Sequence, residues 1–297
     1  ARSSGKGKAL TTLRLSETAA EAKQARLATG IADLDAVLGG GFLPGGVVLV
    51  AGQPGIGKST LLAQVAAFIA QQNQVLYVSG EESVSQVKLR AERLGAVDSE
   101  SLQLASSNSA EDIAASIQTG QYNLVIVDSI QTLSLAEIAS APGSVSQITN
   151  SSNVIIRAAK ASNTAVILVG HVTKEGSIAG PKVLEHLVDV VLNFEGDRYG
   201  GFRVVRAQKN RYGSTNEAAI FEMHEDGLRI VANPSASLLA ERQNLDGSIV
   251  HAPDTPKAIK NVHVITNYQA EYEPFRWAGG LDAQANDAIL VSPNALP

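Results

Sequence analysis

The sequence predicts an α/β fold in which helices flank a mainly parallel sheet and antiparallel strands are added at one side. Two observations support this prediction. From about residue 47 to residue 171, short apolar runs alternate with stretches whose apolar residues recur at helical spacing, which is the pattern of strand-helix-strand units. From residue 187 to about residue 230, strand-like segments follow one another with only short turns between them, which indicates hairpins.

The individual elements follow from apolar spacing and from the turn residues that separate them. A short amphipathic helix is predicted at residues 31–38, where it ends at three consecutive glycines, and Pro44 with two further glycines turns the chain into the first strand. The helices predicted next cover residues 61–72, 84–95, 112–120 and 149–163, and the strands cover residues 74–80, 122–129 and 164–171. The later strand segments are residues 187–196, 201–211, 217–225 and 227–231.

The length of 297 residues accommodates one large α/β domain with attachments. We expect a linker at residues 1–26, which are polar, rich in alanine and without a strong apolar period. The core domain is predicted at residues 27–232. The pattern loosens after that point, so residues 233–297 are predicted to be a C-terminal extension.

Composition excludes several classes of protein. The net charge of −5 argues against a wholly basic nucleic-acid binder, so any such contact needs a local basic patch. The absence of cysteine excludes disulfides and thiolate metal sites, and the five histidines lack zinc-ligand spacing. No apolar run approaches the roughly 20 residues that span a bilayer, and the first residues lack the apolar segment of a signal peptide. We therefore expect a cytoplasmic protein without membrane contact.

The most informative motif is G-x-x-x-x-G-K-S/T at residues 52–59, which lies between an apolar strand and a helical pattern. Its glycines allow backbone N–H groups to point inward, and the following helix adds the positive end of its dipole, so a triphosphate fits there. Lys58 can reach the β and γ oxygens of ATP, while Ser59, or less favourably Thr60, offers a hydroxyl to Mg²⁺. The residues predicted to bind the nucleotide are Gly52, Gln53, Pro54, Gly55, Ile56, Gly57, Lys58, Ser59 and Thr60.

A second chemical feature is Asp128, at the carboxyl end of the buried strand LVIVD. Ligands of such sheets bind at the carboxyl ends of the strands, so Asp128 is placed to hold Mg²⁺ through water opposite Ser59. An aspartate in this place can also be a simple helix cap, although the neighbouring phosphate loop favours the metal role.

Glu81 and Glu82 follow the neighbouring strand and are the third feature. A carboxylate next to the γ-phosphate can orient and deprotonate the attacking water, and we predict this catalytic role for at least one of the two, with Glu81 favoured because it is nearer the strand end. The alternative is an acidic first helical turn, where glutamate is stabilised by the helix dipole.

Eight segments, in order, give the chain a resemblance to a known family. They are TGIADLDAVLGGG, PGIGKSTLL, LYVSGEES, DSIQTL, APGSVSQ, GHVTKEGSIAGPKVLEH, FEGDR and KNRYGSTNEAAIFEM, which together span about residues 29–223. The chain resembles the RadA (Sms) family of bacterial recombination proteins, which are relatives of RecA.

The resemblance implies a RecA-like P-loop ATPase core at residues 27–232 and DNA-stimulated ATP hydrolysis. It further implies a homo-hexameric ring that unwinds DNA or moves branches in homologous recombination and DNA repair. Single-stranded or branched DNA is the expected substrate, and recombinases or replicative helicases are possible partners. Full-length relatives carry an N-terminal four-cysteine zinc module and a C-terminal Lon-like domain; residues 233–297 would lead toward the latter, although residues 253–286 do not match the family pattern.

The family signature KNRYG occupies residues 209–213, and the resemblance implicates Lys209 and Arg211 as catalytic residues that couple hydrolysis to DNA work. The residues themselves allow two uses. The stretch from residue 198 to residue 211 has five basic and no acidic side chains, with aromatic residues nearby, which suits single-stranded nucleic acid. A basic side chain can instead reach a phosphate across a subunit boundary. The third possibility is a solvated hairpin face.

The predicted DNA-binding residues lie in this basic stretch and in a glycine-flanked loop at residues 170–182. The loop resembles the position where RecA relatives bind DNA. His171 at its start can sense the γ-phosphate or can be a packing residue. The small-residue segment 140–146 is predicted to be a second mobile loop. The residues predicted to bind DNA are Lys174, Lys182, Arg203 and Arg206.

Two other functions stay open at this point. One is a RecA-superfamily ATPase that acts on protein, as in relatives of the circadian-clock protein KaiC, which share the TG-x-x-x-LD-x-x-LGGG entry and the paired glutamates. The other is a nucleotide-gated DNA-binding scaffold with negligible turnover. DNA stimulation of hydrolysis separates the first from a recombination ATPase, and measurable hydrolysis excludes the second.

Overall fold

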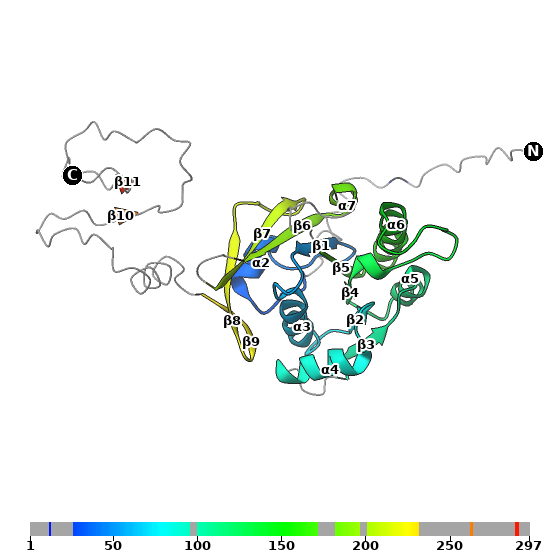
Figure 1. Cartoon of the computed structure of the whole chain (residues 1–297), viewed down its shortest axis with the longest axis horizontal. Coiled ribbons are helices and arrows are strands. Elements are labelled where there is room, and N and C mark those ends of the chain that lie inside the picture. The colour runs from blue at the N-terminus through cyan, green and yellow to red at the C-terminus, as the bar shows by residue number, and fades with distance from the viewer. Residues whose placement is uncertain are drawn as a thin grey trace, which may run out of the picture. The chain divides into compact units, whose positions relative to one another are not determined.

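Figure 1 shows a computed structural model of the whole chain. It describes residues 26–95, 100–171, 182–196 and 201–231, together with Thr12 and two short strands at residues 262–263 and 289–290. The chain divides into two compact units, Ala1–Pro234 and Ser235–Pro297. Within the second unit, β10 (Val262–His263) pairs in parallel with β11 (Ile289–Leu290). The predicted domain limits at residues 26 and 232 stay predictions.

The first unit is built on a nine-stranded sheet in the order β3-β2-β4-β5-β1-β6-β7-β8-β9. Its first six strands in that order are parallel to their neighbours, and the last three are added by antiparallel pairing. The predicted fold class is therefore confirmed. The strands are β1 (Val47–Gly52), β2 (Val75–Ser79), β3 (Leu102–Ser106), β4 (Leu124–Asp128), β5 (Ala165–His171), β6 (Val190–Gly196), β7 (Phe202–Asn210), β8 (Ala218–His224) and β9 (Gly227–Ile230).

Helices cover both faces of the sheet (Figure 1). Because successive strand residues point to opposite faces, Val48 and Val50 pack in one core with α2, α3 and α4, whereas Val47 and Leu49 pack in the other with α5, α6 and α7. The helical elements are α2 (Ala32–Leu38), α3 (Lys58–Ile69), α4 (Val84–Arg93), α5 (Ala110–Gln118), the 3-10 turn η2 (Ile130–Thr132), α6 (Val145–Ser162) and α7 (Lys182–Leu187).

Several elements differ from the sequence prediction. Strand β3 and helix α7 were not predicted, since β3 has only two alternating leucines, Leu102 and Leu104, and α7 has only six residues. Helix α6 begins at Val145 rather than residue 149, because the Ser144 hydroxyl accepts a hydrogen bond from the Gln147 amide and caps the helix four residues earlier. The last two residues of the predicted loop 140–146 are thus helical, and that part of the prediction was wrong.

The order of strands determines where chemistry can occur. In register, Gly52 of β1 lies beside His171 of β5, and Ser79 of β2 lies beside Asp128 of β4. The carboxyl ends of these four parallel strands therefore meet at one edge of the sheet, which we call the carboxyl edge. The opposite edge, where the same strands begin, is the amino edge. Within the described residues, no helix is both long and apolar enough to cross a membrane.

Candidate nucleotide site at the carboxyl edge

The phosphate loop connects β1 directly to α3, as predicted. Gly55 and Gly57 have φ angles of +76° and +114°, a region that residues with a side chain rarely adopt, so these two positions require glycine. Gly57 is also the residue from which α3 begins, and the loop therefore ends at the N-terminus of a 12-residue helix. The free N–H groups and the dipole of that helix favour an anion in this place.

Lys58 is buried, with 4% of its surface exposed, and its ammonium group is directed back over the loop. Its Nζ donates to the carbonyls of Gly52 and Gln53 at 2.8 and 2.9 Å, and it lies 3.1 Å from Nδ1 of His171. Burial lowers the pKa of Lys58 to about 8, although the carboxylates of Asp128 and Glu81 act in the opposite direction. A phosphate oxygen would offer this ammonium the anionic partner that burial otherwise denies it.

On the neighbouring strand, Asp128 receives two short hydrogen bonds on a single oxygen. Ser59 donates its hydroxyl to Oδ2 at 2.6 Å, and Tyr77 donates its hydroxyl to the same atom at 2.6 Å. The predicted pair Ser59 and Asp128 is thus brought together from α3 and β4. Burial, followed by the charge of Asp128, raises the pKa of Tyr77 well above its ordinary value, which keeps this phenol a donor.

These oxygen groups fit a Mg²⁺ ion that accompanies a nucleotide. The described residues contain no group of three or more His, Cys, Asp or Glu side chains that could hold a metal ion. Mg²⁺ is commonly bound by one or two protein oxygens while water and phosphate supply the others. One hydroxyl and one carboxylate beside a phosphate loop are such a set.

The two predicted glutamates point to different partners. Ser129 donates its hydroxyl to Oε1 of Glu81 at 2.6 Å, and Nε2 of His171 lies 3.3 Å from the same oxygen. Glu82 instead forms an ion pair with the guanidinium of Arg90 in α4. The structure therefore connects Glu81, through His171, to Lys58, whereas Glu82 is held against the following helix.

A close approach of two segments places Glu81 in this network. Gly80 donates its amide to the Asp128 carbonyl at 2.8 Å. A Cβ atom added at Gly80 would lie only 2.0 Å from the Thr132 hydroxyl and 2.8 Å from Oδ1 of Asn108, so a larger residue would have to displace these side chains. This glycine brings the end of β2 against Ser129, where the hydroxyl meets Glu81.

The signature residues Lys209 and Arg211 lie at the amino edge. Lys209 pairs with Val191 near the start of β6, and its Nζ donates to the carbonyls of Glu185 and Val188 at 2.6 and 2.7 Å. Arg211 lies 3.4 Å from Oδ1 of Asp189. Both cations are therefore at the opposite end of the parallel strands from the phosphate loop of the same chain.

Asp189 is the centre of this amino-edge cluster. Its side chain is 3% exposed, and Oδ2 accepts the Val47 amide at 3.0 Å and the Lys160 ammonium at 3.0 Å. Burial, followed by the charge of Asp189, raises the pKa of Tyr212 to about 12. Asp189 thus links the first residue of β1 to the signature segment.

The predicted DNA-binding residues lie in different parts of the structure, and one of them is outside the described residues. Lys174 lies outside the described residues, and Lys182 is described only as the first residue of α7. Arg206 is exposed on β7. Arg203 reaches the phosphate loop itself, since its Nε donates to the Ile56 carbonyl at 3.2 Å.

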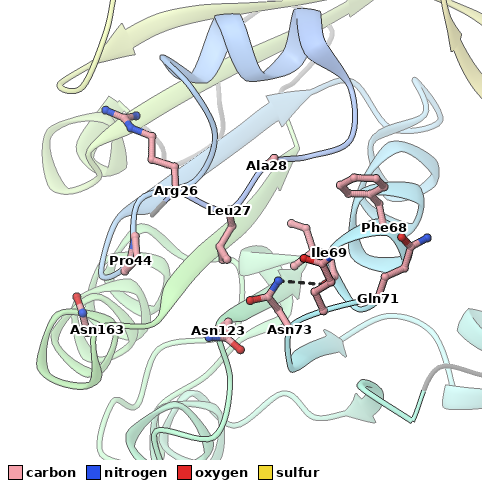
Figure 2. Close-up of a pocket in the computed structure, with 11 residues that line it drawn as sticks. Arg26, Leu27, Ala28, Pro44, Phe68, Ile69, Gln71, Asn73, Asn123 and Asn163 are labelled. Carbon is pink, nitrogen blue, oxygen red and sulfur yellow. Dashed lines mark hydrogen bonds between the residues drawn. The ribbon is translucent and has the colours of Figure 1, made fainter. Parts of the chain in front are cut away.

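A cavity of about 480 Å³ lies away from the phosphate loop. Figure 2 shows that its lining residues come from the segment before α2, the turn before β1, the end of α3 and the loops before β4 and β5. Asn123 and Asn163 lie just before β4 and β5, so this cavity belongs to the amino edge. It is separate from the candidate nucleotide site.

Sequence reasoning missed three residues that support the site: Tyr77, Ser129 and Arg90. Each contacts a residue that the motif analysis had already selected, namely Asp128, Glu81 or Glu82. The strand alternation carries one usable signal: Tyr77 and Ser79 share a face of β2, and Ser79 is in register with Asp128. Nothing in the spacing distinguishes Ser129 or Arg90 from ordinary surface residues.

Comparison with known proteins gives this arrangement a family. A family profile described as an AAA domain matches residues 12–177, which is more than half of the chain. The chain belongs to the AAA domain family. The RadA resemblance expected from the eight segments is also confirmed, because relatives that are 47–52% identical over the aligned residues match most of the chain.

Three relatives illustrate the similarity, and each is named DNA repair protein RadA. The protein from Bacillus subtilis is 47% identical over 264 residues, 88% of this chain and 57% of its own length. The protein from Streptococcus pneumoniae is 52% identical over 223 residues, 75% of this chain and 52% of its own length. The protein from Halalkalibacterium halodurans is 48% identical over 264 residues, 88% of this chain and 58% of its own length. The chain therefore spans little more than half the length of these relatives.

Proposed function

We propose that the chain is a Mg²⁺-dependent ATPase that acts in DNA repair and recombination and is stimulated by DNA. The observation that carries the proposal is the meeting of Lys58, the Ser59 and Asp128 pair, and Glu81 at the carboxyl edge of one sheet. The similarity to proteins named for DNA repair supplies the biological setting. DNA unwinding and branch migration are the finer activities proposed for it.

The roles of the residues follow from their positions. The loop N–H groups and the N-terminus of α3 hold the phosphates, and the Lys58 ammonium stabilises charge on the β and γ oxygens. A bound Mg²⁺ ion neutralises charge that develops on these oxygens. Ser59 and Asp128 would hold that ion, with Thr60 as the weaker alternative to Ser59.

Glu81 is the proposed general base. Its Oε1 already accepts the Ser129 hydroxyl and lies next to His171, so its carboxylate is oriented toward the side of Lys58. From there it can orient a water molecule for attack on the γ-phosphorus and accept its proton. Glu82 is occupied by Arg90, and we assign it the supporting role of holding the turn after β2.

We propose a homo-oligomer, most simply a hexameric ring, in which Lys209 and Arg211 serve the nucleotide of a neighbouring subunit. Both lie at the amino edge, away from the phosphate loop of their own chain, so a catalytic role requires a second chain. DNA contact is assigned to Lys174 and Lys182, and to Arg206, which is exposed on β7. Arg203 is also retained in this set, although it already contacts the loop carbonyl of Ile56.

Hydrolysis of ATP should be measured with Mg²⁺ in the presence and absence of single-stranded DNA, with Lys58→Ala as the inactive control. A rate that increases with DNA supports the proposal. Equal rates with and without DNA would favour an ATPase that acts on protein. DNA binding that depends on nucleotide but shows no turnover would favour the scaffold function. Light scattering with ATP and Mg²⁺ tests the ring, because a monomer at all working concentrations would contradict it.

A further inference from the structure

Tyr77 is a buried phenol at the centre of the candidate nucleotide site that the roles above leave without a function. It is 2% exposed, and Asp128, whose Oδ2 accepts its hydroxyl at 2.6 Å, is 7% exposed. Ser59 donates to the same carboxylate oxygen at 2.6 Å. Two donors from two different elements, β2 and α3, therefore converge on a single oxygen of Asp128.

Sheet geometry explains why a strand residue can reach this carboxylate. Strands β2 and β4 are parallel neighbours, with Tyr77 opposite Ile126 and Ser79 opposite Asp128. Tyr77 lies two residues before the end of its strand, and it belongs to the same buried apolar cluster as Leu61 of α3. A phenylalanine would fill the same space. The hydroxyl is thus the part of this side chain that contributes the contact with Asp128.

The available protons determine which group donates in the hydrogen bond between Tyr77 and Asp128. A carboxylate accepts hydrogen bonds only, and a phenol with an ordinary pKa near 10 carries one proton at neutral pH, so Tyr77 donates to Asp128. The single hydroxyl proton of Ser59 is also used on Asp128. The lone pairs of the Ser59 oxygen are consequently available to a cation, and Oδ1 of Asp128 is available to the water molecules around it.

We propose that Tyr77 is a positioning residue for the cation that accompanies the nucleotide: its hydroxyl holds the Asp128 carboxylate in the orientation that turns the Ser59 oxygen toward the ion. Without this second donor, the carboxylate would be held by Ser59 alone and could rotate. The inference rests on the proposed function, because it concerns the same Mg²⁺ nucleotide. It assigns to the middle residue of β2 a role that no sequence motif indicates.

The test compares Tyr77→Phe with a matched control, Tyr122→Phe. Tyr122 also donates its hydroxyl to a side chain, Oε1 of Gln103 at 2.8 Å, but it lies just before β4 at the amino edge. Equilibrium binding of a fluorescent ADP analogue is measured with Mg²⁺ and with EDTA. We expect Tyr77→Phe to weaken Mg²⁺-dependent binding about five- to tenfold, within the range for the net contribution of one hydrogen bond, and to leave binding in EDTA unchanged. Tyr122→Phe should change neither value.

Three further measurements distinguish positioning from general structural damage. The ATPase rate of Tyr77→Phe should fall most at low Mg²⁺, and the deficit should shrink as Mg²⁺ is raised, because the ion site is weakened rather than lost. In an Asp128→Asn background, Tyr77→Phe should have no additional effect on Mg²⁺-dependent binding, since the acceptor charge is already gone. Circular dichroism melting of each variant reports folding independently of nucleotide.

The outcomes separate this inference from the proposed function. Equal losses of binding with Mg²⁺ and with EDTA would overturn the positioning role, as would no loss at all or an undiminished effect in the Asp128→Asn background. A Tyr77→Phe chain that melts like the wild type but loses only Mg²⁺-dependent affinity supports it. Failure of the wild-type chain to bind the nucleotide more tightly with Mg²⁺ would overturn the proposed ATPase and, with it, this inference.

Discussion

The two edges of the parallel sheet differ in how their buried charged groups are paired. At the amino edge, the buried Asp189 is matched by a backbone amide and two cations, Lys160 and Arg211. At the carboxyl edge, Lys58 is buried against backbone carbonyls and a histidine. Burial of a cation whose direct hydrogen-bond partners are neutral is costly, whereas pairing and hydrogen bonds offset the cost of burying a charge. From this difference we infer that the amino edge stabilises the fold and that the carboxyl edge is arranged to bind a charged ligand.

The largest expected effect at the carboxyl edge is that of Lys58→Ala. The variant removes the ammonium that stabilises charge on the transferred phosphate. The barrier to ATP hydrolysis should therefore rise by several kcal/mol, and the rate should fall on the order of a thousandfold or more. Because the cost of burying the cation is removed as well, its melting temperature should not fall. Steady-state hydrolysis and thermal melting measure the two quantities. A variant that hydrolyses ATP normally would refute the phosphate-loop assignment.

The two glutamates sharpen the comparison within the carboxyl edge. Glu81→Gln should retain nucleotide binding and lose about a hundredfold to ten-thousandfold in hydrolysis, the range for loss of a general base. Glu82→Gln should lose much less, because its carboxylate is engaged by Arg90. Nucleotide titration and single-turnover hydrolysis measure binding and chemistry separately. The reverse ranking of the two variants would move the catalytic role to Glu82.

At the amino edge, the corresponding variant is Asp189→Ala, and its main effect should be on stability. It leaves the Val47 amide and two cations without their partner, and we expect a loss of about 3 kcal/mol in the free energy of unfolding. Urea denaturation measures this loss. The control is Asp226→Ala, whose carboxylate pairs with Arg229 at the surface and whose removal should change stability little. Similar midpoints for both variants would show that the cluster does not hold the fold.

The difference between the edges also explains what the sequence could predict. The carboxyl edge is marked by local motifs, because a phosphate loop needs its glycines, lysine and serine within eight residues. Asp128 was found for a similar reason, since it ends a continuous apolar strand. The amino-edge cluster brings together Val47, Lys160 and Asp189, which are far apart in the sequence, so no local pattern announces it.

Supporting residues were missed for the same physical reason. Gln147 reads as an ordinary polar residue near a helix start, yet it is buried and its amide nitrogen donates to the carbonyls of Ile138 and Ser140 at 2.9 Å. Tyr77 reads as one more residue of a buried strand. Their roles depend on partners that only the folded chain brings near.

A smaller effect is expected from pH, and it again distinguishes the buried cation of the carboxyl edge. The pKa of Lys58 is about 8 without nucleotide. A bound triphosphate favours the charged ammonium, so binding above pH 8 must take up a proton. Affinity should therefore be constant below pH 8 and fall above it, by at most about tenfold per pH unit.

The comparison variant for this prediction is Lys58→Arg, because a guanidinium stays charged throughout this range. Its affinity for nucleotide should be weaker but independent of pH between 7 and about 10. Isothermal titration in buffers of different ionisation enthalpy detects the proton uptake directly. A wild-type affinity that stays flat through this range would contradict the lowered pKa.

The smallest expected signal comes from mixing two inactive variants, and it decides whether the amino edge also serves a neighbouring chain. Lys209→Ala keeps its own phosphate loop, whereas Lys58→Ala keeps Lys209. In a ring with head-to-tail contacts, a Lys209→Ala subunit next to a Lys58→Ala subunit regains a complete site, so a random equal mixture should recover about a quarter of the wild-type rate. The same mixture with Arg211→Ala tests Arg211, for which we expect recovery as well.

If Lys209 acts only by holding the Glu185 and Val188 carbonyls of its own chain, the mixture stays inactive and Lys209→Ala alone loses stability. Activity assays of the mixtures, with urea denaturation of each variant, separate a residue that completes the neighbour's site from one that only supports its own fold.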